Sequence, residues 1–167
     1  TDFAPRGHKQ IELLEYLGSE FDHVSFERVL SGPGLVSIYK FLKARTPEAE
    51  PQWLADEFAR ATDAAEVISA SALSDRDPRC VEALRIFTDI YGAEAANLAL
   101  KFMALGGVYI GGGIAPKILP MLSDGGFVRA FLAKGRLDKV MARIPVRVSL
   151  NEATALIGAA HCAMEML

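Results

Sequence analysis

The sequence contains little cysteine, no excess of basic residues and no long uncharged stretch. Cys80 and Cys162 are the two cysteines among 167 residues, and neither belongs to a Cys-x-x-Cys pair. This excludes a disulfide scaffold and favours a reducing compartment. Eighteen Lys and Arg against 21 Asp and Glu give a net charge of −3 without a basic stripe. We therefore expect no nucleic-acid partner and no anionic membrane surface as a partner.

Two further absences concern membranes and secretion. The longest uncharged stretch, Phe102 to Pro116, carries five glycines and is too short to span a bilayer. Residues 1–5 show neither the basic region nor the apolar region of a secretory signal. We predict a cytoplasmic protein. Because the chain begins with Thr1 rather than Met, we also expect a processed chain or a fragment.

The composition is that of a globular protein. Hydrophobic residues make up 51% and charged residues 23% of the chain, which is too apolar for a disordered segment. The length suggests one domain or one lobe of a larger enzyme. We predict a single domain over residues 1–167.

Apolar spacing predicts a mostly helical α/β chain with a few short strands. Val108–Ile110 and Val146–Val148 are the strand candidates because of their β-branched and aromatic content. The tetrad Ser31-Gly32-Pro33-Gly34 is expected to form a shaped turn before a helix. The expected helices cover residues 8–21, 35–43, 52–62, 64–72, 77–105, 114–122 and 151–166, with shorter helical segments near 125–134 and 137–142.

The clearest predicted element is the long helix that begins at Asp77. Asp77 suits the N-cap and Pro78 the first helical position. Apolar residues recur at steps of three and four, and we expect this stripe to be buried in the core. Small residues from Gly92 to Ala96 predict that another element crosses closely there, and Gly106-Gly107 is expected to end the helix. The stripe consists of Cys80, Leu84, Phe87, Tyr91, Ala95, Leu98, Phe102 and Leu105.

The run Gly111-Gly112-Gly113 follows the first strand candidate and precedes a predicted helix. Glycines without Cβ atoms let backbone N–H groups face a ligand, and a helix N-terminus adds positive partial charge. The run is neither a P-loop nor a dinucleotide fingerprint, because Pro116 stands where those motifs need other residues. A nucleotide site and a tight turn without a ligand both remain open.

Glu27, just before the Ser31–Gly34 tetrad, is a candidate ligand-binding carboxylate. It could accept hydrogen bonds from ligand hydroxyls. The alternative is a surface Glu paired with Arg28 or a lysine.

The three histidines give weak signals. His23 and Glu27 are four residues apart, but one pair is not a metal site, and we predict no metal site on the chain. No Ser-His-Asp arrangement can be assigned. We expect His8 to be solvated, His161 to be a hydrogen-bonded packing residue of the last helix, and Cys162 to be a small core residue.

Three stretches together resemble a known family. They are Asp2-Phe3-Ala4-Pro5, then His23-Val24-Ser25-Phe26-Glu27-Arg28-Val29-Leu30-Ser31-Gly32-Pro33-Gly34, and finally Gly106-Gly107-Val108-Tyr109-Ile110-Gly111-Gly112-Gly113-Ile114-Ala115-Pro116. In this order they closely resemble the C-terminal part of the bacterial glucokinase family, over essentially the whole chain. The resemblance implies an actin- and hexokinase-type (ribonuclease H-like) fold with two lobes, of which this chain is the larger C-terminal lobe with a partial sheet.

The resemblance also implies site residues. Glu27 matches the family's glutamate that binds sugar hydroxyls. Gly106, Gly107, Gly111, Gly112, Gly113 and Ile114 match the motif that lines the adenosine side of the ATP site. Gly111 stands where many relatives carry alanine, a mild departure. We expect the glutamate and the glycine turn to face the same cleft.

The family's catalytic aspartate, first phosphate loop and a Glu-Gly-Gly-His stretch precede the Asp-Phe-Ala-Pro motif. The resemblance therefore implies no catalytic residue in this chain, and that the 167 residues alone are inactive. For the whole protein it implies ATP-dependent phosphorylation of glucose in glycolysis, with Mg²⁺ bound through ATP and the N-terminal lobe, and a possible homodimer. The alternative is a non-catalytic sugar or nucleotide sensor on the same fold.

Overall fold

The computed structural model describes residues 1–166 and divides the chain into two compact units. Unit 1 comprises Thr1–Tyr91, and unit 2 runs from Gly92 to the end of the chain. The division falls within the longest helix, α5 (Pro78–Lys101). The prediction of one domain over residues 1–167 stays a prediction. No helix within residues 1–166 combines the length and the apolar character that a bilayer span requires.

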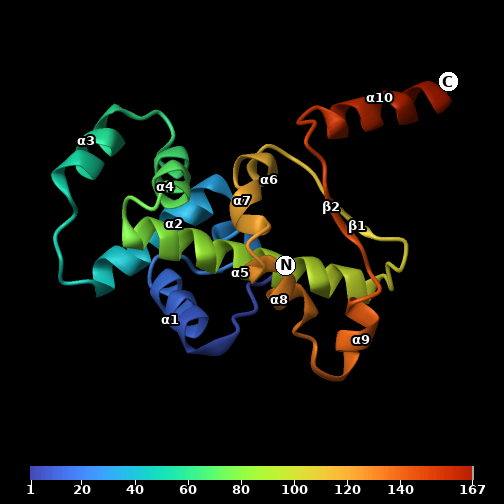
Figure 1. Ribbon diagram of the computed structural model, residues 1–167, viewed down its shortest axis with the longest axis horizontal. Coiled ribbons are helices and arrows are strands. Elements are labelled where there is room, and N and C mark those ends of the chain that lie inside the picture. The colour runs from blue at the N-terminus through green and yellow to red at the C-terminus, as the bar shows by residue number, and fades with distance from the viewer. Residues whose placement is uncertain (167) are drawn as a thin grey trace. The chain divides into compact units, whose positions relative to one another are not determined.

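The regular elements of unit 1 are all helices, and Asp2 and Ser25 form an isolated bridge between two of its non-helical segments. Helix α2 packs against α1 and α4 (Figure 1), and Leu13, Ile38 and Ile68 are fully buried on these three helices. Its elements are α1 (Gly7–Gly18), η1 (Phe26–Arg28), α2 (Gly32–Arg45), α3 (Gln52–Arg60), α4 (Ala64–Leu73) and the first part of α5.

Helix α2 begins three residues earlier than we predicted. The Ser31 hydroxyl accepts a hydrogen bond from the Gly34 N–H at 3.0 Å and caps the helix. Pro33 lies in the first turn, where its missing N–H costs nothing. The tetrad is therefore the capped start of the helix rather than a separate turn, and Gly34 is buried against the backbone of Val29.

Unit 2 contains a two-stranded parallel sheet in which β1 (Val108–Ile110) pairs with β2 (Val146–Val148) (Figure 1). Val108 stands opposite Val146 and Ile110 opposite Val148. The predicted strands and the mostly helical α/β class are confirmed. The helices of unit 2 after α5 are α6 (Ile114–Lys117), α7 (Leu119–Leu122), α8 (Gly126–Leu132), η2 (Gly135–Leu137), α9 (Asp138–Met141) and α10 (Thr154–Glu165).

The close crossing predicted for α5 is present in unit 2. A Cβ on Gly92 would lie 2.4 Å from the carbonyl oxygen of Phe127 and 3.1 Å from the Cβ of Ala130, both on α8. Because no side chain fits in that space, α8 lies directly on the helix backbone at this point.

Several details of the prediction were wrong. Helix α5 ends at Lys101, and Met103 adopts a φ of +45° before Gly106 is reached. The last part of the apolar stripe, Leu98, Phe102 and Leu105, is exposed within this chain, with Phe102 at 72%. Helix 114–122 is interrupted at Ile118, where Pro120 in the first turn of α7 begins a new helix.

The last helix, α10, was expected to bury its Ala, Leu and Met side chains. None of its residues is buried in the described part of the chain. Leu156 and Met164 are among the exposed large apolar side chains. The prediction of an inward apolar face on this helix was wrong, because residues 1–166 provide no surface that covers it.

Candidate functional site

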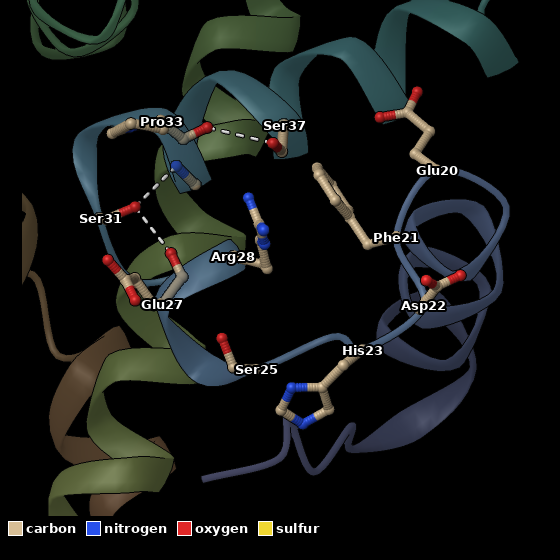
Figure 2. Close-up of a pocket in the computed structure, with 11 residues that line it drawn as sticks. Glu20, Phe21, Asp22, His23, Ser25, Glu27, Arg28, Ser31, Pro33 and Ser37 are labelled. Atoms are coloured by element: carbon tan, nitrogen blue, oxygen red, sulfur yellow. Dashed lines mark hydrogen bonds between the residues drawn. The ribbon is translucent and has the colours of Figure 1, made fainter.

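A cavity of roughly 650 Å³ in unit 1 contains Glu27 in its wall. Figure 2 shows the polar side chains Ser31, Arg28, Ser25 and His23 around this cavity together with Glu27. All of its walls come from two short stretches of sequence, residues 20–28, which lead into and include η1, and residues 31–37 at the start of α2. The lining residues are Glu20, Phe21, Asp22, His23, Ser25, Glu27, Arg28, Ser31, Pro33, Gly34 and Ser37.

The chain from His23 to Glu27 alternates between the cavity and the core. His23, Ser25 and Glu27 line the cavity, whereas Val24 is buried and Phe26 packs edge-on against Phe3 at 5.8 Å. Residues 23–25 follow the period-two pattern of an extended segment, which the bridge between Asp2 and Ser25 holds, and Glu27 follows in η1. The wall of the cavity therefore rests on apolar contacts behind it.

The Glu27 carboxylate is exposed, and no hydrogen bond or ion pair to it is found among residues 1–166. The alternative of a Glu paired with Arg28 does not occur there, because the Arg28 guanidinium lies 4.0 Å over the ring of Phe21. A cation over an aromatic face is held there by the ring quadrupole. Glu27 thus presents free acceptor oxygens to the cavity.

The hydroxyls of Ser31 and Ser37, two of the three serines of the cavity lining, are bonded to the backbone. The Ser31 hydroxyl donates to the Glu27 carbonyl oxygen at 2.7 Å while it accepts from Gly34 (Figure 2). The Ser37 hydroxyl donates to the Pro33 carbonyl oxygen at 3.1 Å. The bond from Ser31 joins the backbone of Glu27 to the start of α2, so the backbone that carries the carboxylate is held in place, whereas the bond from Ser37 lies within α2.

The second candidate site, the glycine run, lies in unit 2. A Cβ on Gly111 or Gly112 would meet nothing within 4 Å, and Gly112 has a φ of +98°. No contact within the described chain therefore requires glycine at 111. Gly107 differs, since its Cβ would lie 3.0 Å from the Pro145 carbonyl oxygen, and this glycine is explained by the pairing of β1 with β2.

The prediction that a helix N-terminus adds positive partial charge to this glycine run was wrong. Helix α6 comprises only the four residues Ile114–Lys117, and a macrodipole needs a longer run of aligned peptides. What the turn offers is accessible backbone N–H groups between Gly111 and Ile114.

The remaining candidate residues are two histidines and two cysteines. His8 is exposed beside Glu12, as predicted. The predictions for His161 and Cys162 were wrong: His161 is exposed next to Glu165, and Cys162 is exposed as well. Burial, with Asp77 nearby, raises the pKa of the Cys80 thiol to about 12, so Cys80 is no candidate nucleophile.

Residues 1–166 contain no cluster of three or more His, Cys, Asp or Glu side chains that could hold a metal ion. The described residues therefore do not fit a Mg²⁺ ion of their own. That Mg²⁺ is bound through ATP and another part of the protein stays a prediction.

Comparison with known proteins decides the family. The family model described as Glucokinase matches residues 1–166. The chain belongs to the glucokinase family. A glucokinase from Synechocystis sp. is 43% identical over 98% of this chain and 50% of its own length, and one from Chromobacterium violaceum is 44% identical over 98% of this chain and 44% of its own length.

A solved structure agrees with the glucokinase assignment. The crystal structure of a glucokinase from an Antarctic psychrotroph matches with a TM-score of 0.79 and 35% identity, over 97% of this chain and 47% of that one. The hexokinase-type fold implied by the sequence motifs is thereby confirmed. The chain spans about half the length of the curated relatives it matches.

Sequence reasoning did not identify His23, Ser25 or the Arg28–Phe21 pair as cavity residues. The available signal was the alternation of polar and apolar residues from 23 to 27. It covers only five positions, which is too few to predict a strand with one face on a cavity.

Proposed function

We propose that the whole protein transfers the γ-phosphoryl group of ATP to the 6-hydroxyl of glucose. The observation on which this proposal depends is the Glu27 carboxylate, which lines the cavity and has no hydrogen-bond partner within residues 1–166. The Ser31 hydroxyl holds the Glu27 backbone carbonyl, and the glucokinase family model matches residues 1–166. In this proposal Glu27 accepts hydrogen bonds from sugar hydroxyls. The oxygen of the 6-hydroxyl forms a bond to the γ-phosphorus of ATP, and the bond from that phosphorus to the bridging oxygen of the departing ADP breaks. The hydroxyl proton passes to a base in a part of the whole protein outside these 167 residues.

The charge of the cavity supports a neutral polyol as its ligand. Glu20, Asp22 and Glu27 contribute carboxylates to the lining, against one guanidinium from Arg28. Carboxylates accept hydrogen bonds from hydroxyls and repel a phosphorylated product. Such a lining favours binding of the sugar over retention of its phosphate ester.

The turn at Gly111, Gly112 and Gly113, with Gly106, Gly107 and Ile114, is proposed to seat the nucleotide. Phosphoryl transfer depends on positioning and charge stabilisation rather than on covalent chemistry by the protein. Backbone N–H groups on a turn without Cβ atoms suit that positioning. The protein's proposed partners are therefore glucose and ATP.

Glu27→Ala in the whole protein is expected to weaken glucose binding by about 1.5–3 kcal/mol, the range for a hydrogen bond to a charged group. Isothermal titration calorimetry measures this directly. Glu15→Ala is the matched control, since Glu15 is an exposed α1 residue outside the cavity lining. Unchanged glucose affinity in Glu27→Ala would remove Glu27 from the sugar site.

Gly112→Val is expected to raise the KM for ATP several-fold while changing glucose affinity little. A β-branched residue resists the φ of +98° found at this position. Gly135→Val is the control, because Gly135 also has a positive φ, +57°, and open space around its Cβ but lies outside this turn. Steady-state kinetics with each substrate varied in turn checks the result, and equal effects on both substrates would count against the nucleotide assignment.

A further inference from the structure

The Nε2 atom of His23, a cavity residue, lies 2.6 Å from a carboxylate oxygen of Asp2. The hydrogen bond from His23 lowers the pKa of Asp2, so the carboxylate is ionised and acts as the acceptor. Nε2 must then carry a proton. In a neutral imidazole this leaves Nδ1 as an acceptor.

Two backbone hydrogen bonds hold Asp2 opposite Ser25. The Phe3 N–H donates to the Val24 carbonyl oxygen at 2.9 Å and the Phe26 N–H to the Thr1 carbonyl oxygen at 3.0 Å, and together these bonds form the bridge between Asp2 and Ser25. Behind them the buried Phe3 ring packs on Phe26. The backbone that carries Asp2 is therefore held beside the segment that carries His23, while the two side chains themselves are 87% and 65% exposed.

The second nitrogen of His23 has no assigned partner. Within residues 1–166 no hydrogen bond to Nδ1 is found, while the ring lines the cavity together with Ser25 and Glu27. Figure 2 shows the imidazole on the Ser25 side of the cavity, away from the Ser31 end. His23 and Glu27, four residues apart in the sequence, thus place two acceptors, Nδ1 and the carboxylate, in the lining of one cavity.

We propose that His23 Nδ1 accepts a hydrogen bond from a second hydroxyl of the ligand bound at Glu27, and that Asp2 holds the imidazole in the tautomer that makes this possible. The proposal rests on the proposed function, because it takes the cavity as the sugar site. His23 is then a ligand-binding residue, and Asp2 is a positioning residue that acts through it. The charged groups that share the cavity lining with His23 are Glu20, Asp22, Glu27 and Arg28.

The first test measures glucose affinity of the whole protein by calorimetry. His23→Phe is expected to weaken binding about three- to tenfold, the effect of one lost neutral hydrogen bond. His23→Asn should retain part of the affinity, because its Oδ1 attaches at the same position as Nδ1. Asp2→Ala should weaken binding as well, but should add nothing in a His23→Phe background. His8→Phe, on an exposed histidine outside the cavity, is the matched control.

The second test asks which partner donates the hydrogen. A panel of monodeoxy and deoxyfluoro glucoses is titrated into the wild type and into His23→Phe. Because fluorine accepts but cannot donate, the deoxyfluoro sugar should bind as weakly as the deoxy sugar at the position that His23 contacts. At that position the wild type and His23→Phe should bind the analogue equally.

The outcomes separate the two proposals. If Glu27→Ala weakens glucose binding while His23→Phe does not, or if no deoxy position couples to His23, the role of His23 is overturned and the sugar site stands. If the wild-type protein does not bind glucose, both proposals fail. Melting temperatures of the variants show whether a loss of affinity reflects a loss of folding, and His23→Asn provides a milder variant if His23→Phe unfolds.

Discussion

Asp77→Ala is expected to lower the free energy of unfolding by about 3–5 kcal/mol, the largest effect predicted for a single change in this chain. The Asp77 carboxylate caps α5 by accepting from the N–H groups of Arg79 at 2.9 Å and Cys80 at 3.0 Å. It also pairs with the Arg79 guanidinium at 3.4 Å, and the side chains of Asp77 and Arg79 are only 2% and 9% exposed. Removing the carboxylate leaves a buried guanidinium whose remaining hydrogen bonds within residues 1–166 are those to the carbonyl oxygens of Glu48 and Ala49.

A comparison with Asp63→Ala separates the contribution that Asp77 makes by capping α5 from the contribution that it makes by pairing with Arg79. Asp63 caps α4 by accepting from the Ala65 N–H at 2.9 Å, but it is exposed and no buried cation pairs with it in the described chain. Loss of this cap should cost about 1 kcal/mol. Urea unfolding of both variants gives the comparison. Equal losses would show that the buried Asp77–Arg79 pair contributes nothing beyond helix capping.

Gly34→Ala is expected to reduce stability by about 1–3 kcal/mol and to weaken glucose binding in the same variant. A Cβ at this position would lie 2.7 Å from the carbonyl carbon and 2.8 Å from the Cα of Val29. Because these are backbone atoms, the segment that carries Glu27 has to move. The loss of sugar affinity then follows from the displacement of the carboxylate rather than from a lost contact of Gly34.

Gly32→Ala is the control for this variant. It lies two residues earlier in the first turn of α2, and its Cβ would make an ordinary contact of 3.7 Å with the Ala65 Cβ. We expect stability and glucose affinity close to those of the wild type. If Gly34→Ala also left stability and glucose affinity close to those of the wild type, the close approach of α2 to Val29 would not position the sugar site.

Local sequence signals predicted the elements whose cause is local. Asp77 and Pro78 mark the start of α5 because a cap and a donor-free first position are properties of neighbouring residues. Gly92 marks the crossing of α8 because only a missing Cβ allows that approach. The family motifs around Glu27 and Gly112 predicted the fold, which the relatives and the solved structure confirm.

Features that depend on distant packing were not predicted. The apolar period of α5 continues through Leu98 and Phe102, but periodicity gives no information on what covers a face, and both side chains are exposed here. The same reason explains α10, whose apolar residues were expected to be buried. The Asp2–His23 contact joins residues 21 positions apart, and no local sequence pattern predicts a contact between residues so far apart.

The central claim is that the cavity at Glu27 binds the sugar and the turn at Gly112 binds the nucleotide. Hydrogen–deuterium exchange on the whole protein tests it directly, with glucose and a non-hydrolysable ATP analogue added separately. We expect glucose to slow exchange in peptides covering residues 23–37 and the nucleotide to slow it in peptides covering residues 106–114. Protection by glucose outside residues 23–37, with these amides unchanged, would contradict the claim.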